Sequence, residues 1–172
     1  MPFVALAQSD TTGSSVSSAL QSLVVPSILV LIALIAINAF FVAGETALEL
    51  LRPSHIKTAT DEKNQAILQR LLDRRPQCVA GCTLVRQTAL WWIVMVSFVP
   101  AAAITQRLAA AGSISLTATS YLVTWFIIAL PVALVNMIFA EIVPKTAASV
   151  RPVAIATRTA RAMHTAATIF RL

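Results

Sequence analysis

Residues 24–44 read VVPSILVLIALIAINAFFVAG and contain no charged side chain. A helix rises about 1.5 Å per residue, so a stretch of roughly 20 residues crosses the hydrocarbon core of a bilayer. Residues 87–106 and 108–140 are also uncharged and long enough to cross. The sequence therefore predicts three membrane-spanning helices, over about residues 24–51, 78–105 and 116–142.

The composition of the whole chain supports this reading. Of its 172 residues, 58% are hydrophobic and 12% are charged, and the mean hydropathy is +0.81. A soluble domain carries about 25% charged residues, so a soluble enzyme, a disulfide scaffold and a disordered protein are all disfavoured. The predicted fold class is an all-α membrane protein, with three transmembrane helices and cytoplasmic juxtamembrane amphipathic helices.

The basic residues report the topology of the chain. The net charge is +6 and the pI about 10.4, but the Lys and Arg residues are unevenly distributed. Six stand between the first two spans and five after the third, whereas Arg107 stands alone between the second and third: Arg52, Lys57, Lys63, Arg70, Arg74 and Arg75, then Lys145, Arg151, Arg158, Arg161 and Arg171. Because Lys and Arg gather on the cytoplasmic side, we expect a multi-pass protein of the inner (plasma) membrane, with its N-terminus outside and its C-terminus inside. Anionic lipid headgroups are expected partners, and nucleic acid is not.

The chain divides into a tail and one membrane domain. The Ser- and Thr-rich residues 1–22 are predicted to be a flexible extracytoplasmic tail, and residues 23–172 the transmembrane domain. Helical apolar spacing predicts juxtamembrane helices over about residues 54–76 and 151–172. The second span is expected to break at Pro100. The basic tail stops within a helical pattern, so we expect the natural protein to continue.

Cysteine and histidine give no sign of catalysis. Cys78 and Cys82 share one helical face near the cytoplasmic side, but two thiols without a nearby His or Asp favour small packing residues over a metal site. His55 and His164 stand outside the spans, with no evident nucleophile or metal partner. We do not expect an enzyme.

Three ionisable residues inside the predicted spans are singled out, each near a cytoplasmic end: Glu45, Arg86 and Glu141. Ionisable groups in a membrane are costly, so each is a functional hypothesis. Glu45, followed by further charged residues, can also simply mark the membrane interface.

Glu141 has two readings. Pro144 has no N–H to bond the carbonyl of Ala140, so a free carbonyl oxygen would lie beside the carboxylate. Mg²⁺ prefers oxygen ligands of this kind, and broken membrane helices often bind ions through such carbonyls. The alternative is an i, i+4 ion pair between Glu141 and Lys145. Spacing alone leaves both open.

Two motifs resemble a known family. Residues 40–48, FFVAGETAL, resemble the first-span motif of the CorC/cyclin M (CNNM) magnesium transporters, and residues 140–145, AEIVPK, resemble their third-span Gly-Glu-Ile-x-Pro-Lys motif. Between the motifs lie an amphipathic segment and a second span, in the family's order. The resemblance covers roughly residues 24–172, the transmembrane (DUF21) module.

The resemblance implies a homodimer that moves Mg²⁺ out of the cytoplasm, coupled to Na⁺. Cytoplasmic CBS domains would follow downstream of residue 172. The family's ion site combines a first-span Ser, second-span Asn residues and the third-span Glu, which corresponds to Glu141. The first-span Ser falls at Gly44, which has no side-chain oxygen. The second-span Gly-Asn-Asn-x-x-Asn pattern falls on Arg86, Gln87, Thr88 and Trp91.

These departures leave two functions open. Gln87 and Thr88 still offer oxygens, whereas Trp91 is large enough to obstruct the path. Arg86 would take the place of a bound cation if it approached Glu141, but would leave that acid available if it extended to the headgroups. The first function is a CorC-like Mg²⁺ transporter whose candidate ligands are Glu141, Ala140, Gly44, Thr88 and Gln87, with Glu45, Arg86, Trp91, Pro144 and Lys145 as gating or charge partners. The second is a non-conducting regulatory or structural membrane subunit with a degenerate site.

Overall fold

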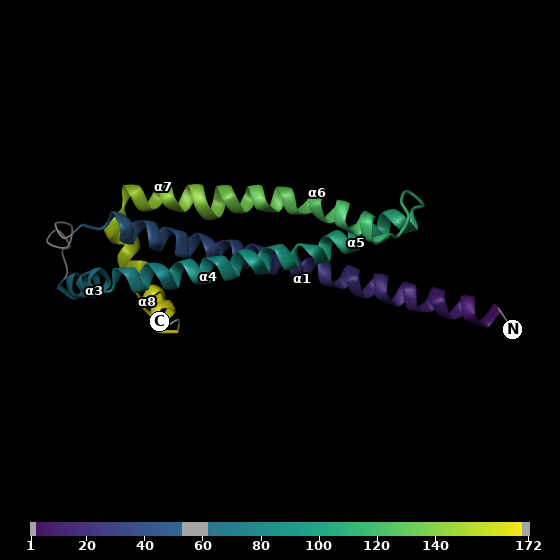
Figure 1. Ribbon diagram of the computed structural model, residues 1–172, viewed down its shortest axis with the longest axis horizontal. Coiled ribbons are helices and arrows are strands. Elements are labelled where there is room, and N and C mark those ends of the chain that lie inside the picture. The colour runs from purple at the N-terminus through teal and green to yellow at the C-terminus, as the bar shows by residue number, and fades with distance from the viewer. Residues whose placement is uncertain (1–2, 53–61, 170–172) are drawn as a thin grey trace. The chain divides into compact units, whose positions relative to one another are not determined.

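The computed structural model describes residues 3–52 and 62–169, and all of its regular structure is helical (Figure 1). In chain order the elements are α1 (Phe3–Leu50), α3 (Glu62–Asp73), α4 (Arg75–Val96), α5 (Phe98–Ala110), α6 (Ala118–Asn136), the π-helix η1 (Met137–Ile142), α7 (Val143–Val150) and α8 (Pro152–Ile169). No strand occurs in these two ranges. The all-α fold class is confirmed.

Within the described part of the chain, three stretches of helix are long and apolar enough to cross a membrane: Gln21–Leu50, Arg75–Ala110 and Ala118–Val150. They confirm the number and the order of the predicted spans. The third continues past residue 142, because η1 and α7 extend α6 without a break. The chain is therefore a multi-pass membrane protein.

The structure differs from the sequence-based expectation at the N-terminus. Helix α1 begins at Phe3, so residues 3–22, predicted as a flexible tail, are helical. Adding residues to an existing helix is much easier than nucleating one, so the long apolar helix extends into the tail. Residues 54–61 and 170–172 of the two predicted juxtamembrane segments lie outside the described residues. Helices α3 and α8 occupy most of the remainder, and residues 75–76 belong to α4.

The second span is interrupted where proline predicts it. A turn at Ser97 separates α4 from α5, and Pro100 follows in the first turn of α5. Pro100 has no N–H for the carbonyl four residues earlier, which weakens the helix at this point. The side chain of Ser97 is buried, donates to the Val94 carbonyl at 2.7 Å and accepts from Trp125 Nε1 at 3.1 Å. These bonds satisfy polar groups that lipid would not.

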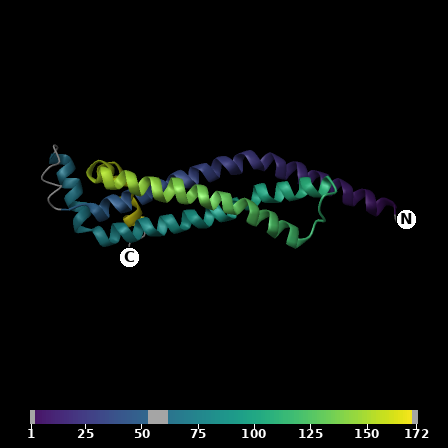
Figure 2. The ribbon, with the colours of Figure 1, turned by 90° about the horizontal axis from the view of Figure 1, so that it is seen from above.

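The chain forms two compact units, one of residues 1–33 and 93–133, the other of residues 34–92 and 134–172. The second contains all three ionisable residues identified within the spans, and the candidate site is built in it. Figures 1 and 2 show the chain turning sharply within this unit, where α7 gives way to α8.

Two apolar clusters hold the second unit together. Both join α1, α3 and α8, the first with α4 and the second with α7: Leu48, Leu71, Cys78, Cys82, Ala160 and Met163, then Ala47, Leu51, Leu68, Ala148 and Ala156. Cys78 and Cys82 are free and buried, as predicted for packing residues. Arg75 Nη2 also donates to the Glu49 carbonyl at 2.7 Å, which satisfies an acceptor in the last turn of α1.

Candidate functional site

Arg86 is paired with Glu45. Its Nη1 lies 2.6 Å from Glu45 Oε2, and the two side chains are 24% and 13% exposed. The hydroxyl of Thr83 donates to the other carboxylate oxygen at 3.0 Å. Arg86 therefore meets the first-span acid, which was neither of the two placements considered from the sequence. Thr83 was not identified from the sequence as a partner of Glu45. Thr83 stands three residues before Arg86 and thus on the same face of α4, but threonine is too common in such helices for this spacing to single it out.

Glu141 lies in the π-helical segment η1. The N–H of Val143 donates to the Ile138 carbonyl, an i→i−5 bond that marks the wider π turn. Single π turns inside α-helices occur frequently at functional sites. The helix is thus irregular at the acid that the sequence singled out.

The alternative ion pair of Glu141 is also present, in a loose form. Lys145 Nζ lies 3.8 Å from Glu141 Oε2, and the two side chains are 52% and 34% exposed. Exposed i, i+4 pairs stabilise by only about 0.3–0.5 kcal/mol. Another cation can therefore displace Lys145 from Glu141 at little cost. The pair between Arg86 and Glu45 is shorter and more buried, so it is harder to break.

A buried stripe runs along the third span beside Glu141. Asn136, Ala140, Pro144 and Ala148 are all buried at intervals of four residues. Such spacing places them on one face of the helix, and Glu141 stands at its edge, half-buried. Ala140 and Pro144, the residues expected to supply and release a carbonyl oxygen, therefore face the interior of this unit.

Two asparagines link the first and third spans. Asn38 Nδ2 donates to Asn136 Oδ1 at 3.0 Å, and both residues are buried. Asn38 Oδ1 has no hydrogen-bond partner among the described residues. The sequence analysis missed this pair, although an asparagine inside each apolar stretch was the visible signal. The bond fixes α1 against the start of η1.

Replacing Asn38 with leucine is expected to lower the free energy of unfolding by about 1 kcal/mol, because Asn136 then loses its partner in a buried setting. The double variant N38L/N136L should recover part of this loss, since neither amide is then left unpaired. Thermal unfolding in detergent micelles measures both. Strictly additive losses would contradict a direct interaction between the two amides.

The other second-span residues that the resemblance assigns to the ion site, Gln87, Thr88 and Trp91, are exposed. Gln87 and Thr88 are exposed, and the Thr88 hydroxyl donates to the Leu84 carbonyl of its own helix at 2.9 Å. Trp91 is 61% exposed. The structure does not bring these three side chains into the buried stripe, and the indole of Trp91 faces outward.

Gly44 lies where α1 meets α8. A Cβ at this position would stand 3.1 Å from Met163 Sδ and 3.1 Å from Thr159 Oγ1. Both neighbours are buried side chains of α8. At the position where the resemblance expects a serine, α1 and α8 are therefore packed too closely to leave free space for a side chain.

Within residues 3–52 and 62–169, no three His, Cys, Asp or Glu side chains come together in a group that could hold a metal ion. An ion at Glu141 would need backbone, amide or hydroxyl oxygens as its other ligands. Hard divalent cations accept such mixed oxygen sets.

Comparison with known proteins gives one match. The profile of the cyclin M transmembrane N-terminal domain (CNNM) matches residues 29–172. No curated protein and no solved structure matched the chain. The matched range covers most of the chain and contains most of the first span, all of the other two spans, and Glu45, Arg86 and Glu141. The chain therefore belongs to the cyclin M (CNNM) transmembrane-domain family, which suggests a role in Mg²⁺ transport or its regulation.

Proposed function

We propose that this chain transports Mg²⁺ across the membrane, with the carboxylate of Glu141 as the central ligand. The Ala140 carbonyl, next to Pro144, is the proposed second oxygen. Gln87 and Thr88 of α4 and the Gly44 carbonyl are further candidates, each of which requires movement from the arrangement described above. Gln87 and Thr88 are exposed on α4, and Gly44 is packed against α8.

The pairing of Arg86 with Glu45 carries the proposal. A unit charge pair at 4 Å is worth about 4 kcal/mol at an effective dielectric of 20, so a guanidinium on Glu141 would oppose a divalent cation. Arg86 is instead 2.6 Å from Glu45, and its charge is neutralised there. The partner of Glu141 is Lys145, at 3.8 Å and more exposed, which an arriving cation can displace.

The irregular helix supports movement as well as binding. A π turn next to a proline leaves backbone groups with more than one possible hydrogen-bonding arrangement. Broken helices of this kind bind ions and shift in transporters. We propose that the segment around Glu141 shifts as the ion passes from one side of the membrane to the other.

Topology and partners complete the proposal. The distribution of Lys and Arg supports a plasma-membrane orientation with the N-terminus outside and Glu141 near the cytoplasmic face. Efflux coupled to Na⁺, a homodimer, and regulation by CBS domains downstream follow from the family resemblance.

Substituting Glu141 with glutamine should weaken Mg²⁺ binding at least tenfold, because the neutral amide loses the charge that attracts the ion. The measurement is the shift in thermal unfolding of purified protein with added MgCl₂. Glu49→Gln is the matched control, since it removes an exposed carboxylate from α1. Parent protein that shows no Mg²⁺ shift, or a control that loses the shift equally, would contradict the site.

A second function is favoured by the placement of the other family positions. Gly44 is packed against α8, and Gln87, Thr88 and Trp91 face outward, so fewer side-chain ligands converge than the family pattern provides. The chain would then bind Mg²⁺ without conducting it and act as a regulatory subunit. Mg²⁺ flux into proteoliposomes separates the two. Flux that appears only after Arg86→Gly is combined with Asn at positions 87, 88 and 91 identifies the regulator.

A further inference from the structure

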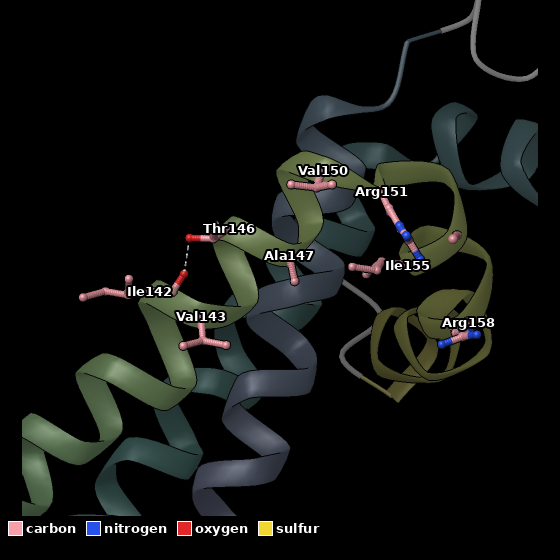
Figure 3. Close-up of a pocket in the computed structure, with 9 residues that line it drawn as sticks. Ile142, Val143, Thr146, Ala147, Val150, Arg151, Ile155 and Arg158 are labelled. Atoms are coloured by element: carbon pink, nitrogen blue, oxygen red, sulfur yellow. Dashed lines mark hydrogen bonds between the residues drawn. The ribbon is translucent and has the colours of Figure 1, made fainter.

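A groove lies between the end of the third span and α8 (Figure 3). Its volume is about 590 Å³, and its lining comes from α7, α8, the turn between them and the last residue of η1. The lining residues are mostly apolar: Ile142, Val143, Thr146, Ala147, Val150, Arg151, Ala154, Ile155 and Arg158. In Figure 3 Ala147 and Ile155 face each other across it, with the Arg151 side chain beside Ile155.

The polar side chains that line the groove are two arginines and one threonine, and the threonine is already hydrogen-bonded within its own span. Arg151 and Arg158 are exposed and have no ion pair or side-chain hydrogen bond to any described residue. Arg151 stands in the turn before α8 and Arg158 lies within α8, and both line the groove. The hydroxyl of Thr146 donates to the Ile142 carbonyl at 2.9 Å. Among the described residues that line it, the groove therefore offers two guanidinium groups without a partner and no acid.

The apolar part belongs to a membrane span. Ile142 and Val143 are 49% and 51% exposed, and both lie in the stretch Ala118–Val150 that is long enough to cross the bilayer. The arginines begin where that stretch ends. An apolar wall at membrane depth, followed by free arginines at its basic end, matches a molecule with an acyl chain and a negatively charged head.

The geometry points to a binding site for one anionic phospholipid, with its phosphate between Arg151 and Arg158 and an acyl chain along Ile142, Val143 and Ala147. Arginine suits phosphate because its planar fork donates two parallel hydrogen bonds. Basic ends of spans face the leaflet in which anionic lipids are concentrated. This site is separate from the proposed Mg²⁺ ligands, and it does not depend on whether the chain conducts the ion.

A second groove in the other unit provides a contrast. It has a volume of about 500 Å³ and lies between the end of α5 and α6. The described residues that line it are all uncharged: Leu108, Ile114, Ser115, Thr117, Thr119, Ser120, Val123, Thr124 and Ile127. Size and apolar lining are thus shared by both grooves, and the free arginine pair distinguishes the first.

Native mass spectrometry of the protein in micelles, titrated with phosphatidylglycerol or phosphatidylcholine, tests the site. The parent protein should retain phosphatidylglycerol selectively. The double variant R151Q/R158Q should bind it about 25-fold more weakly, at roughly fivefold for each basic residue near the headgroups. The control is Arg161→Gln, which removes one positive charge from an exposed position of α8 outside the groove and is compared per charge removed.

A second variant tests the groove without changing its charge. Ala154→Phe places a ring in the lining and should also displace the lipid. An equal loss per removed charge in R161Q and R151Q/R158Q, or equal binding of the two lipids, would overturn the proposal in favour of general charge attraction. If glycerol phosphate bound as tightly as the whole lipid, the acyl chain would contribute nothing, and the groove would be a site for an anion and not for a lipid. A doubled mass without bound lipid, lost in A154F, would instead assign the groove to a second copy of the chain.

Discussion

Replacing Arg86 with glutamine is expected to lower the free energy of unfolding by about 3 kcal/mol, because it leaves the Glu45 carboxylate without its partner in a largely buried position. The two side chains are 24% and 13% exposed, and their charged atoms lie 2.6 Å apart. For a chain of this size such a loss corresponds to a decrease of about 6–12 °C in the unfolding midpoint. Thermal unfolding of the purified protein in detergent measures it.

The double variant E45Q/R86Q is the control for this prediction. It removes both charges together and should be close to the parent in stability, since no unpaired charge is then buried. Mg²⁺ provides a second readout. In R86Q the uncompensated Glu45 carboxylate attracts cations, so Mg²⁺ should stabilise R86Q more than it stabilises the parent. Equal losses in R86Q and E45Q/R86Q would show that the ion pair is not what holds α1 and α4 together here.

The fold was largely predictable because it follows from average hydropathy and charge over stretches of about 20 residues. Three uncharged stretches, the basic segments beside them and Pro100 predicted the spans and the interruption near Ser97. These signals are local to each helix. The helical start of α1 at Phe3 was missed, because a Ser- and Thr-rich segment has no apolar period that distinguishes a helix extension from a flexible tail.

The site was less predictable because it depends on which side chains meet between helices. The sequence identified Glu45, Arg86 and Glu141 as the costly residues, but spacing cannot show that Arg86 meets Glu45 across 41 residues. The Asn38–Asn136 bond spans 98 residues and was missed for the same reason. The π turn around Glu141 has no sequence signature beyond the nearby proline, so it required the structure.

Replacing Gly44 with valine is expected to cost about 2 kcal/mol, because the added carbons overfill a packed contact. A Cβ alone would stand 3.1 Å from Met163 Sδ and Thr159 Oγ1, and both residues are buried. The matched control is Ala43→Val, which adds a branched side chain at the adjacent, half-buried position of α1. Comparison of the unfolding midpoints of the two variants separates overpacking from a change in helix propensity.

Met163→Ala tests the cause of that loss. Alone it should be destabilising, since it opens a cavity in the first apolar cluster. Combined with Gly44→Val, it vacates part of the space that the valine needs, so the double variant should lose about 1 kcal/mol less than the sum of the two single losses. Additive losses would mean that the valine is accommodated away from α8.

The same contact explains why this chain departs from the family pattern at this position. Serine, which the resemblance places here, carries the same Cβ that meets Met163 and Thr159 in this chain. Gly44→Ser should therefore require α8 to move by a few tenths of an ångström, and it should be destabilising, though less so than Gly44→Val. If Gly44→Ser instead matched the parent in stability and strengthened the Mg²⁺ shift, the hydroxyl would have to turn away from α8 toward Glu141. That result would mean that helix packing does not require glycine at position 44, and that a serine there can serve as an ion ligand.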